Sequence, residues 1–502
     1  MEKTSVIVIG CNSISFLITQ IQDNGYFKII DELNSPIRLY YDLILNNKIS
    51  NIKLEETLSI LRSYKSLSKI HGSREPIVFS TSFLEKSKNK DEFVKVINEN
   101  LDMEVTILND LDIIYYNYLA VVNSIDLNNA LLVDISGEST HISWMLNGAI
   151  KDSFTLPLGT LNLSYAFNLE DKILKEDLDN AILYIKKELS KINKFKGIKL
   201  NNIVGTGKTI HSIANLDKER KKYPLDIIHN YTTTDIDIQD IYNLLKCKSL
   251  AQRKRLYKLT PCMADIIVGG ALILKEIVSY YDISNILICG RGLKEGIIFD
   301  YVYKNYCPVS NILDYNLYGI MENLNINKSH AEKLYYTTKE LFTALKPLHH
   351  LDDGYHNIIK TASYLHDSGI SVDYYNYHNH SFYMILNSYI SGLTHRELLI
   401  SSAIVASPKN SSYNFLSPTY GVLINKLDIK AIDKIGVLLS IAEGLNESFE
   451  DSIENIEVSI KENSVIIIIS SKLDLKFQIN RAMNASRMFH EIYDKNLLIY
   501  KK

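Results

Sequence analysis

The sequence carries one short pattern twice, and this repeat limits what the chain can fold into. An apolar run at residues 6–10 (VIVIG) leads into a small polar loop, a second apolar run and the dipeptide Asn24-Gly25. The run at residues 130–135 (ALLVDI) leads into a similar loop, a similar second run and Asn147-Gly148. Asn-Gly between apolar runs is a strong hairpin signal. The sequence therefore predicts a duplicated strand–loop–strand unit, although two unrelated hairpins in an α/β protein would give the same pattern.

Further apolar, β-branched runs alternate with amphipathic stretches over the first three hundred residues, which predicts an α/β architecture. These predicted strands lie at residues 76–80, 103–108, 201–205 and 283–290. From about residue 310 the apolar periods are long and glycine is sparse, which predicts an all-α region. The last fifty residues return to strand-like runs and close with an amphipathic helix; the runs lie at residues 454–460, 464–471 and 474–479.

The bulk composition is that of an ordinary globular protein. Of 502 residues, 46% are hydrophobic and 23% charged, and the formal net charge is -3, so the charge favours neither a nucleic-acid duplex nor an anionic membrane as a partner. The five cysteines show no CxxC spacing, which argues against a disulfide framework or a zinc ribbon. The first residues do not resemble a signal peptide. We therefore expect a reduced, cytoplasmic protein.

The two repeated loops have the chemistry of phosphate-binding turns. Residues 10–13 (GCNS) and 136–139 (SGES) are small and polar, so their backbone N–H groups can point at an anion. If the two loops face each other across a cleft, they would hold a polyanion from both sides. Asp134 ends the strand before the second loop, where a carboxylate serves a metal or a water molecule or caps the turn.

Together these motifs resemble the exopolyphosphatase / guanosine pentaphosphate phosphohydrolase (Ppx/GppA) family. IGCNSISFLI, STSFLEKSKN, DISGEST, IVGTGKTIHSIA and CGRGLKEGIIFD follow in the family's order, and the resemblance continues through an HD-type helical region at YLHDSGI. It implies an α/β fold of duplicated actin-like ATPase (ribonuclease H-like) domains, then an all-α HD-like domain and a small C-terminal α/β segment. The implied boundaries are 1–125, 126–305, 310–450 and 451–502.

The resemblance also implies an activity and a set of site residues. It implies a Mg²⁺- or Mn²⁺-dependent hydrolase, acting as a homodimer in the stringent response, that removes terminal phosphate from inorganic polyphosphate or pppGpp. It places the general base on Asp112 and a second catalytic, metal-binding carboxylate on Asp134. The implied phosphate-binding residues are Asn12, Ser13, Ser82, Gly137, Ser139, Thr140, Gly205, Thr206 and Gly207. In the helical region it implies metal ligands at His330, His366 and Asp367, with ordinary core histidines as the alternative.

Several positions depart from the family pattern. Val8 stands where the pattern has Asp, Glu85 where it has Arg, Ser136 and Glu138 where it has glycines, and Lys208 where a small residue is usual. The net effect is a more negative cleft, which predicts weaker anion binding unless Glu138 pairs with Lys208 or coordinates the metal. Three hypotheses remain open: a hydrolase, a catalytically impaired protein that binds polyphosphate or (p)ppGpp in a regulatory role, and a scaffold that dimerises through its HD-like domain.

Overall fold

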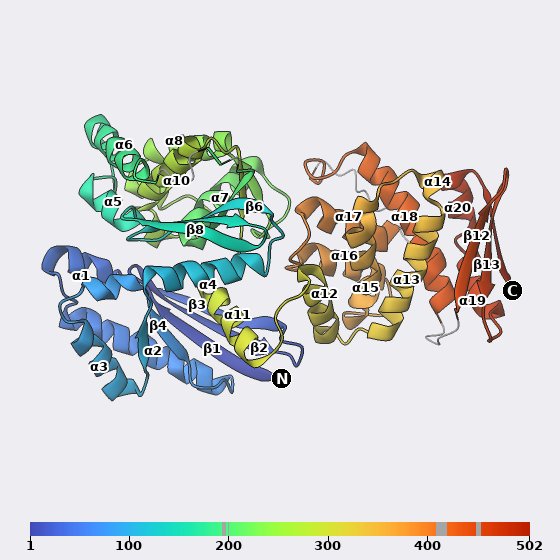
Figure 1. Ribbon diagram of the computed structural model, residues 1–502, viewed down its shortest axis with the longest axis horizontal. Helices are drawn as coiled ribbons and strands as arrows, with labels where there is room; N and C mark the ends of the chain where they lie inside the picture. The colour runs from blue at the N-terminus through green and yellow to red at the C-terminus, as the bar shows by residue number, and fades with distance from the viewer. Residues whose placement is uncertain (193–196, 199, 408–418, 448–452) are drawn as a thin grey trace. The chain divides into compact units, whose positions relative to one another are not determined.

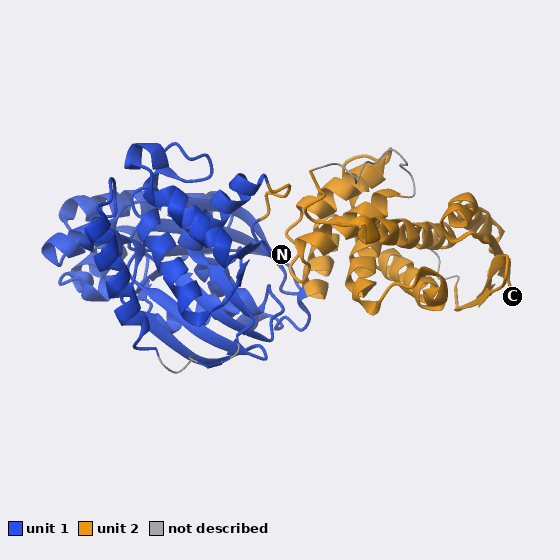
Figure 2. Cartoon of the chain, turned by 90° about the horizontal axis from the view of Figure 1, so that it is seen from above, with its two compact units in different colours: residues 1–222, 228–312 blue, residues 223–227, 313–502 orange. Residues whose placement is uncertain are grey.

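The computed structural model describes residues 1–192, 197–198, 200–407, 419–447 and 453–502, which form two compact units (Figure 2). The first unit contains residues 1–222 and 228–312, and the second contains residues 223–227 and 313–502. The finer boundaries expected near residues 125 and 450 stay predictions. Within the described ranges, no helix combines the length and the apolar character that a membrane crossing needs.

The first unit begins with a five-stranded sheet in the order β3-β2-β1-β4-β5. β1 to β3 form an antiparallel meander, and β4 and β5 continue the sheet parallel to β1. The strands span Glu2–Ile9 (β1), Ser13–Ile21 (β2), Phe27–Pro36 (β3), Ile77–Ser80 (β4) and Val105–Ile107 (β5).

The second sheet of this unit repeats that topology. Its order is β10-β11-β9-β6-β7-β8, with β6 to β8 as the antiparallel meander, β9 and β11 parallel to β6, and β10 added antiparallel to β11. The strands span Asn129–Ile135 (β6), Thr140–Leu146 (β7), Ala149–Leu156 (β8), Asn202–Thr206 (β9), Thr232–Thr234 (β10) and Asn285–Ile288 (β11). The predicted duplication is therefore confirmed, and the reading as two unrelated hairpins is wrong.

The likeness extends to the backbone of the loops. The Gly10 N–H donates to the Ser13 carbonyl oxygen at 3.0 Å, and the Ser136 N–H donates to the Ser139 carbonyl oxygen at 2.9 Å. At the far end of β7, Asn147 and Gly148 have φ values of 50° and 71°. Positive φ at both central residues is the requirement of a type I′ turn, which Asn-Gly meets with little strain.

Helices pack around the two sheets, as Figure 1 shows. Around the first sheet the helical elements are α1 (Leu39–Asn46), α2 (Asn51–Ile70), the 3₁₀ helix η1 (Ser82–Lys86) and α3 (Lys90–Leu101). With the second sheet come α5 (Thr160–Ala166), α6 (Lys175–Leu189), α7 (Gly207–Lys221), α8 (Asp235–Lys246), α9 (Leu250–Arg253), η2 (Pro261–Met263) and α10 (Ile267–Tyr281).

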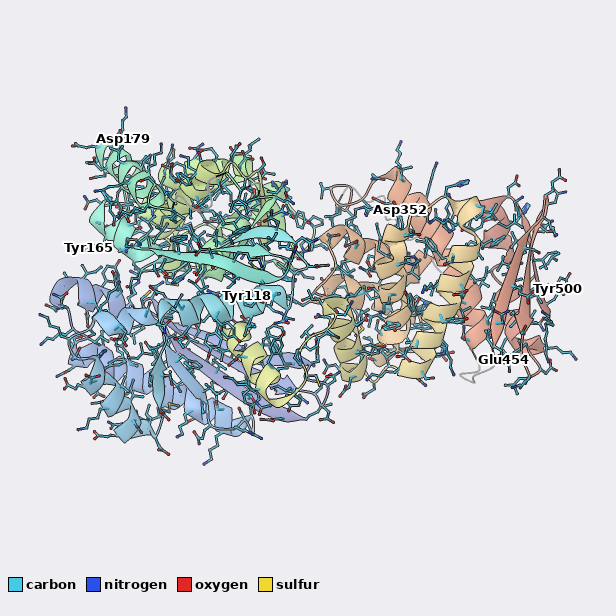
Figure 3. The ribbon with its side chains drawn as sticks, in the orientation of Figure 1. Tyr118, Tyr165, Asp179, Asp352, Glu454 and Tyr500 are labelled. Atoms are coloured by element: carbon cyan, nitrogen blue, oxygen red, sulfur yellow. The ribbon has the colours of Figure 1, made fainter. Side chains whose placement is uncertain are left out.

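Helix α4 (Asp110–Val122) links the two sheets and is crossed by α11 (Leu293–Asn305). Its Tyr116 ring packs against Phe79 of β4, with centroids 5.9 Å apart. Its Tyr118, labelled in Figure 3, donates a hydrogen bond of 2.8 Å to the carbonyl oxygen of Gly148 in the β7–β8 turn. Helix α4 thus contacts both halves of the repeat, whose loops lie at residues 10–13 and 136–139.

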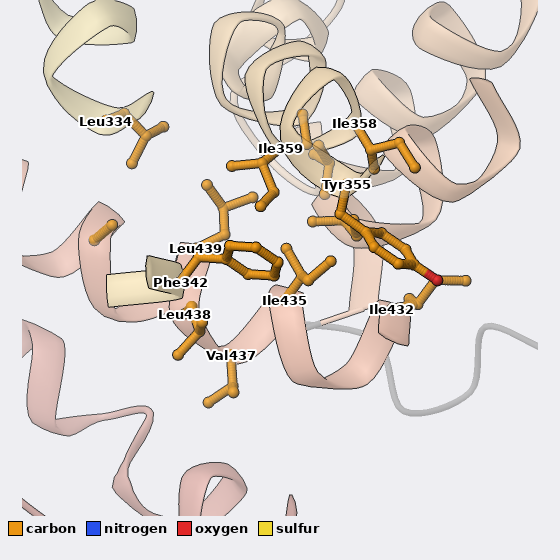
Figure 4. Packing of buried hydrophobic residues seen from close by; sticks show 14 of the residues in the cluster. Leu334, Phe342, Tyr355, Ile358, Ile359, Ile432, Ile435, Val437, Leu438 and Leu439 are labelled. Atoms are coloured by element: carbon orange, nitrogen blue, oxygen red, sulfur yellow. The ribbon is translucent and has the colours of Figure 1, made fainter. Parts of the chain in front are cut away.

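The second unit is mainly helical and has its own core. Figure 4 shows side chains such as Phe342, Ile359, Ile435 and Leu439 packed together in its interior. Its helical elements are α12 (Ile312–Asn323), α13 (Lys328–Ala344), α14 (Lys346–His349), η3 (Asp353–Tyr355), α15 (His356–Tyr364), η4 (His366–Ser371), α16 (Tyr377–Asn387), α17 (His395–Ala406) and α18 (Lys426–Asn446). The predicted all-α region is confirmed.

The C-terminal segment differs in detail from the prediction. Its sheet, in the order β12-β13-β14, uses the predicted runs as β12 (Asn455–Ile460) and β13 (Ser464–Ser470). The strand predicted at residues 474–479 is wrong, because this stretch begins helix α19 (Lys476–Met483). The final helix α20 (Ser486–Tyr493) is followed by an unpredicted strand, β14 (Asn496–Lys501), which pairs parallel to β13. Helix α19 buries Ala482 against Gly444 of α18, a contact that a six-residue window of sequence cannot reveal.

Candidate active site

A pocket of about 170 Å³ lies where the two repeated loops meet. The loops touch across it, since a methyl group placed on Gly137 would lie 2.5 Å from the Cys11 Sγ atom. The pocket also has walls from β2, α5 and α7. The lining residues are Val8, Gly10, Cys11, Asn12, Ser13, Ser15, Thr81, Asp134, Ile135, Ser136, Gly137, Thr160, Lys208, Thr209, Met263 and Ile266. The predicted residues Asn12, Ser13, Asp134 and Gly137 are thus brought together.

Asp134 is the carboxylate that lines this pocket. It ends β6, opposite Thr206 of β9 in the parallel pairing. Its Oδ2 atom accepts a hydrogen bond of 3.0 Å from the Asn117 side-chain amide on α4, and Asn117 is only 3% exposed. A buried amide donor and the start of helix α7 therefore fix the orientation of the Asp134 side chain.

His141 on β7 lies between two carboxylates, and it was not expected from the sequence. Its Nδ1 atom is 3.6 Å from Asp134 Oδ2, and its Nε2 atom is 3.5 Å from Asp110 Oδ1. Burial alone would lower the pKa of His141, but the hydrogen bond with Asp110 and the nearby charges of Asp110 and Asp134 outweigh burial and raise this pKa to about 9. The same contact with His141 lowers the pKa of Asp110. Asp110, His141 and Asp134 thus form a row of three interacting charged side chains beside the pocket.

Glu138 does not pair with Lys208, as one of the sequence alternatives supposed. Its carboxylate forms an ion pair with Lys86, which η1 presents from the other side of the cleft. The Glu138 side chain is only 7% exposed, so this pair holds the second loop against the first half of the unit. Glu85, the other predicted negative charge, is exposed and pairs with Lys90. The two charges that made the cleft more negative in sequence are therefore both offset by lysines.

Lys208 reaches across the cleft from the start of α7. Its Nζ atom donates to Ser13 Oγ at 2.8 Å, to Ser15 Oγ at 3.1 Å and to Asn34 Oδ1. The Lys208 ammonium thus touches the first phosphate loop itself. Val8, which also lines the pocket, contributes an apolar surface on β1, and its Cα partner in the pairing with β2 is Ser15.

The other predicted phosphate-binding residues are not among those that line the pocket. Ser82 Oγ donates to Asp110 Oδ1 at 2.8 Å. Ser139 Oγ lies 3.3 Å from Ser136 Oγ, and Thr140 Oγ1 donates to the Leu158 carbonyl oxygen at 2.5 Å. Thr206 Oγ1 donates to the Arg291 carbonyl oxygen at 2.6 Å, and it is also the N-cap residue of α7. These contacts give the four side chains structural partners, and their role toward phosphate stays a prediction.

Gly205 and Gly207 complete the turn between β9 and α7. A methyl group on Gly205 would lie 2.6 Å from Ile210 Cγ2, so its absence lets the helix start close to the strand. Gly207 has a φ of 85° and begins α7 beside Asp134. The turn therefore sets where α7, and with it Lys208, begins.

Asp112 is placed as a helix cap. Its backbone N–H donates to Asn109 Oδ1, and its Oδ2 accepts from the Asn109 N–H, both at 3.0 Å, which forms a capping box at the start of α4. Asp110, two residues earlier, is the acidic residue of α4 that contacts His141. The role of Asp112 as general base stays a prediction.

The second unit gathers the predicted residues of its HD-like site into a buried cluster. His366 Nδ1 lies 2.9 Å from Asp367 Oδ1, and His330 Nε2 lies 3.5 Å from Asp367 Oδ2. Burial raises the pKa of Asp367, but the hydrogen bond and charge of His366 outweigh this and the pKa is lowered. Glu443 lies near, 3.9 Å from His366 Nε2. The metal expected here stays a prediction.

The donors at the pocket set limits on a bound metal. Among the described residues, no three His, Cys, Asp or Glu side chains converge so that they could hold a metal ion together. Mg²⁺ at phosphate sites, however, commonly takes one or two carboxylates and completes its shell with phosphate and water oxygens. Asp134 could serve as such a carboxylate for Mg²⁺ or Mn²⁺, and the ion itself stays a prediction.

Four residues of this site were not predicted from the sequence: Lys86, Asp110, Asn117 and His141. Asn117 had a signal, because it is a polar residue in the apolar stripe of α4, where a buried amide needs a partner. His141 follows the second loop by two residues in an otherwise apolar strand, which is the same kind of signal. Lys86 had none, since its partner lies 52 residues away in sequence.

Comparisons with known proteins agree with this geometry. A model of the Ppx/GppA phosphatase family matches residues 17–305, and a model of domain III of that family matches residues 314–487. The bifunctional 3-dehydroquinate synthase/phosphatase of Fusobacterium nucleatum is 26% identical over 307 residues, which are 59% of this chain and 46% of that protein. The chain thus spans less than half of that relative. The guanosine-5'-triphosphate,3'-diphosphate pyrophosphatase of Aeromonas hydrophila is 22% identical over 411 residues, 81% of this chain and 80% of that protein.

Solved structures show the same fold. An Aquifex aeolicus member of the Ppx/GppA family gives a TM-score of 0.54 at 24% identity, covering 61% of this chain and 99% of that one. An exopolyphosphatase from Cytophaga hutchinsonii gives a TM-score of 0.57 at 17% identity, covering 61% of this chain and 100% of that one. The predicted fold class is confirmed: an actin-like α/β unit, a helical region and a small C-terminal α/β segment. The chain belongs to the Ppx/GppA phosphatase family.

Proposed function

We propose that this chain hydrolyses the terminal phosphoanhydride bond of a linear polyanion, either inorganic polyphosphate or pppGpp. The observation that carries the proposal is the pocket in which both repeated loops and Asp134 meet. The names of two similar proteins, a guanosine-5'-triphosphate,3'-diphosphate pyrophosphatase and an exopolyphosphatase, support the substrate class.

The size of the pocket supports attack at a chain end. At about 170 Å³ it is smaller than the roughly 300–1,000 Å³ of sites that enclose drug-sized ligands. It has room for a terminal phosphoryl group, while the rest of a polyphosphate chain or a nucleoside would extend outside it.

In the proposed reaction, backbone N–H groups of the two loops bind the oxygens of the terminal phosphoryl group. Asp134 orients the attacking water and accepts its proton. The water oxygen bonds to the terminal phosphorus, and the bond between that phosphorus and the bridging oxygen breaks. The two products are inorganic phosphate and the substrate shortened by one phosphate. His141 and Asn117 hold Asp134 in place. A Mg²⁺ ion shared by Asp134 and phosphate would supply further charge neutralisation.

The test is phosphate release from long-chain polyphosphate and from pppGpp, each with Mg²⁺ and with EDTA, by the wild type and Asp134→Ala. Asp179→Ala is the matched control, because Asp179 is an exposed carboxylate on α6, outside the pocket (Figure 3). We expect Mg²⁺-dependent release by the wild type and the control and a large loss in Asp134→Ala.

If a well-folded wild type releases phosphate from neither substrate, the hydrolase proposal fails. Retained binding of either polyanion in that case would favour the catalytically impaired binding protein. Release that survives in Asp134→Ala would move the chemistry away from this pocket.

A further inference from the structure

Lys208 lines the pocket, and none of its hydrogen-bond partners among the described residues carries a negative charge. Within the part of the chain that the structure describes, its Nζ atom contacts only neutral oxygens, those of Ser13, Ser15 and Asn34. Two other charged side chains act on it, Lys294 and Glu32, and these already form an ion pair with each other. Lys208 therefore differs from Lys86 and Lys90, whose charges are offset by glutamates.

An ammonium among neutral oxygens gains more from an anion than from its present partners. Hydrogen bonds between charged groups are about twice as strong as neutral ones. The Lys208 side chain is exposed on one side of the cleft, yet partial desolvation by the cleft, together with the charge of Lys294, lowers its pKa to about 8. The lowered pKa means that the charged form of Lys208 is disfavoured in this cleft, and a bound anion would stabilise that charged form.

The position of Lys208 matches the site where an anion would be held. Its backbone follows Gly207, which lies against Asp134, and its ammonium touches Ser13 of the first loop. Solvent reaches the side chain from the open side of the cleft. A flexible lysine stem can therefore turn its ammonium from Ser13 toward a phosphate between the loops while the backbone stays in place.

We propose that Lys208 binds an oxygen of the substrate's terminal phosphoryl group and is a substrate-binding residue of this chain. This proposal rests on the proposed function, because it assumes that the pocket receives a phosphate chain end. Lys208 supplies positive charge at the wall where β1 carries Val8 and so offers no carboxylate ligand of its own.

The hydrogen bonds of Lys208 also fit a second, purely structural role, that of a brace that joins the two halves of the unit. A brace depends on the acceptors Ser15 and Asn34, whereas a phosphate ligand depends on the ammonium itself. Asn34 on β3 does not line the pocket, so its removal weakens a brace and leaves the charge available.

The experiment is the binding of inorganic tripolyphosphate by calorimetry to the whole chain, in EDTA and in Mg²⁺, at two ionic strengths. The variants are Lys208→Met, which removes the charge at similar length, Lys208→Arg, which keeps it, and Asn34→Ala. Thermal melting of each variant reports whether the fold is retained. Phosphate release from polyphosphate is measured on the same samples.

We expect Lys208→Met to weaken tripolyphosphate binding about tenfold or more, as the loss of a charge-assisted hydrogen bond predicts. Its affinity should also depend less on salt. Lys208→Arg and Asn34→Ala should bind close to the wild type, and the pattern should persist in EDTA. Lys208→Met binding that equals the wild type, or Asn34→Ala binding that falls as far as that of Lys208→Met, overturns the proposal.

The failure of this proposal and of the proposed function can be told apart. Hydrolysis by the wild type with an unchanged KM in Lys208→Met leaves the function standing and removes the role of Lys208. Binding that depends on Lys208 without any phosphate release leaves the role of Lys208 standing and removes the hydrolase. A folded wild type that does not bind tripolyphosphate contradicts both.

Discussion

Gly207 and Asp134 are packed so closely that a methyl group on the Gly207 α-carbon would lie 2.2 Å from the Asp134 Oδ1 atom. Gly207 also has a φ of 85°, a value that residues with a side chain rarely adopt. The turn between β9 and α7 therefore sets the position of the pocket's carboxylate, and helix α7 can begin beside Asp134 only because residue 207 has no side chain.

We expect Gly207→Ala to lower the free energy of unfolding by about 1–2 kcal/mol, because alanine is strained at this φ. We also expect it to reduce phosphate release strongly, since the added methyl must displace the Asp134 carboxylate. Urea denaturation and the release assay measure the two effects. Gly72→Ala is a suitable control, since Gly72 has a φ of 69° but nothing within 4 Å of the added methyl. Equal loss of activity in both variants would contradict the role of the contact with Asp134.

The interaction of His141 with Asp110 and Asp134 predicts a pH dependence of stability. The pKa of His141 is raised from 6.5 to about 9. Its ion pairs therefore stabilise the folded state fully below about pH 6.5 and lose this contribution as the pH rises through about 9. His141→Gln should cost on the order of 1–3 kcal/mol near pH 6.5 and progressively less toward pH 9.

Urea denaturation of the wild type and His141→Gln across this pH range checks the prediction. His490→Gln serves as control, because His490 is exposed on α20. A stability difference between wild type and His141→Gln that does not change with pH would show that His141 carries no charge in this site.

The ion pair of Glu138 and Lys86 predicts a gain in anion affinity when the acid is removed. Glu138→Gln should tighten tripolyphosphate binding about two- to fivefold, since it frees the Lys86 ammonium and removes a negative charge beside the loop. Glu85→Gln should leave the affinity unchanged, because Glu85 is exposed and paired with Lys90. Calorimetric titration compares the two. Unchanged affinity in Glu138→Gln would mean that the Lys86 charge does not reach the bound anion.

Asp110 and Asp112 lie two residues apart in α4, where their side chains do not share a face of the helix, so they should behave differently. Asp112→Asn should cost about 0.5–1 kcal/mol of stability through the altered capping box. Asp110→Asn should reduce phosphate release more than Asp112→Asn does, because Asp110 contacts His141 beside Asp134. The phosphate release rates of the two variants, corrected for the folded fraction by thermal melting, show which of the two carboxylates matters more for the reaction. A larger loss in Asp112→Asn would support the general base that the family resemblance implied.

The sequence predicted the backbone of the first unit well and the charges of its site poorly. The repeat could be found because hairpin turns such as Asn147-Gly148 and strands such as residues 130–135 are encoded locally. The pairing of Glu138 with Lys86 could not, because it depends on how two segments 52 residues apart meet in space. The same limit applies to His141, whose two carboxylates come from different elements.

The C-terminal segment shows the limit for secondary structure. Residues 474–479 alternate like a strand, yet helix α19 forms there and packs on α18. The run at 464–471 was predicted correctly because its continuous β-branched residues favour a strand by themselves, and β13 is also the central strand of its sheet. Tertiary packing decided the first case and local preference the second.

The duplicated loops give the two sides of the pocket the same backbone pattern but different side chains. On one side the strand before the loop carries Val8, and on the other it carries Asp134. A linear polyphosphate has two equivalent ends, so nothing in such a substrate can tell the halves of the protein apart. In the reaction we propose, the difference between the side that binds the phosphate and the side that reacts with it is therefore set by the protein alone.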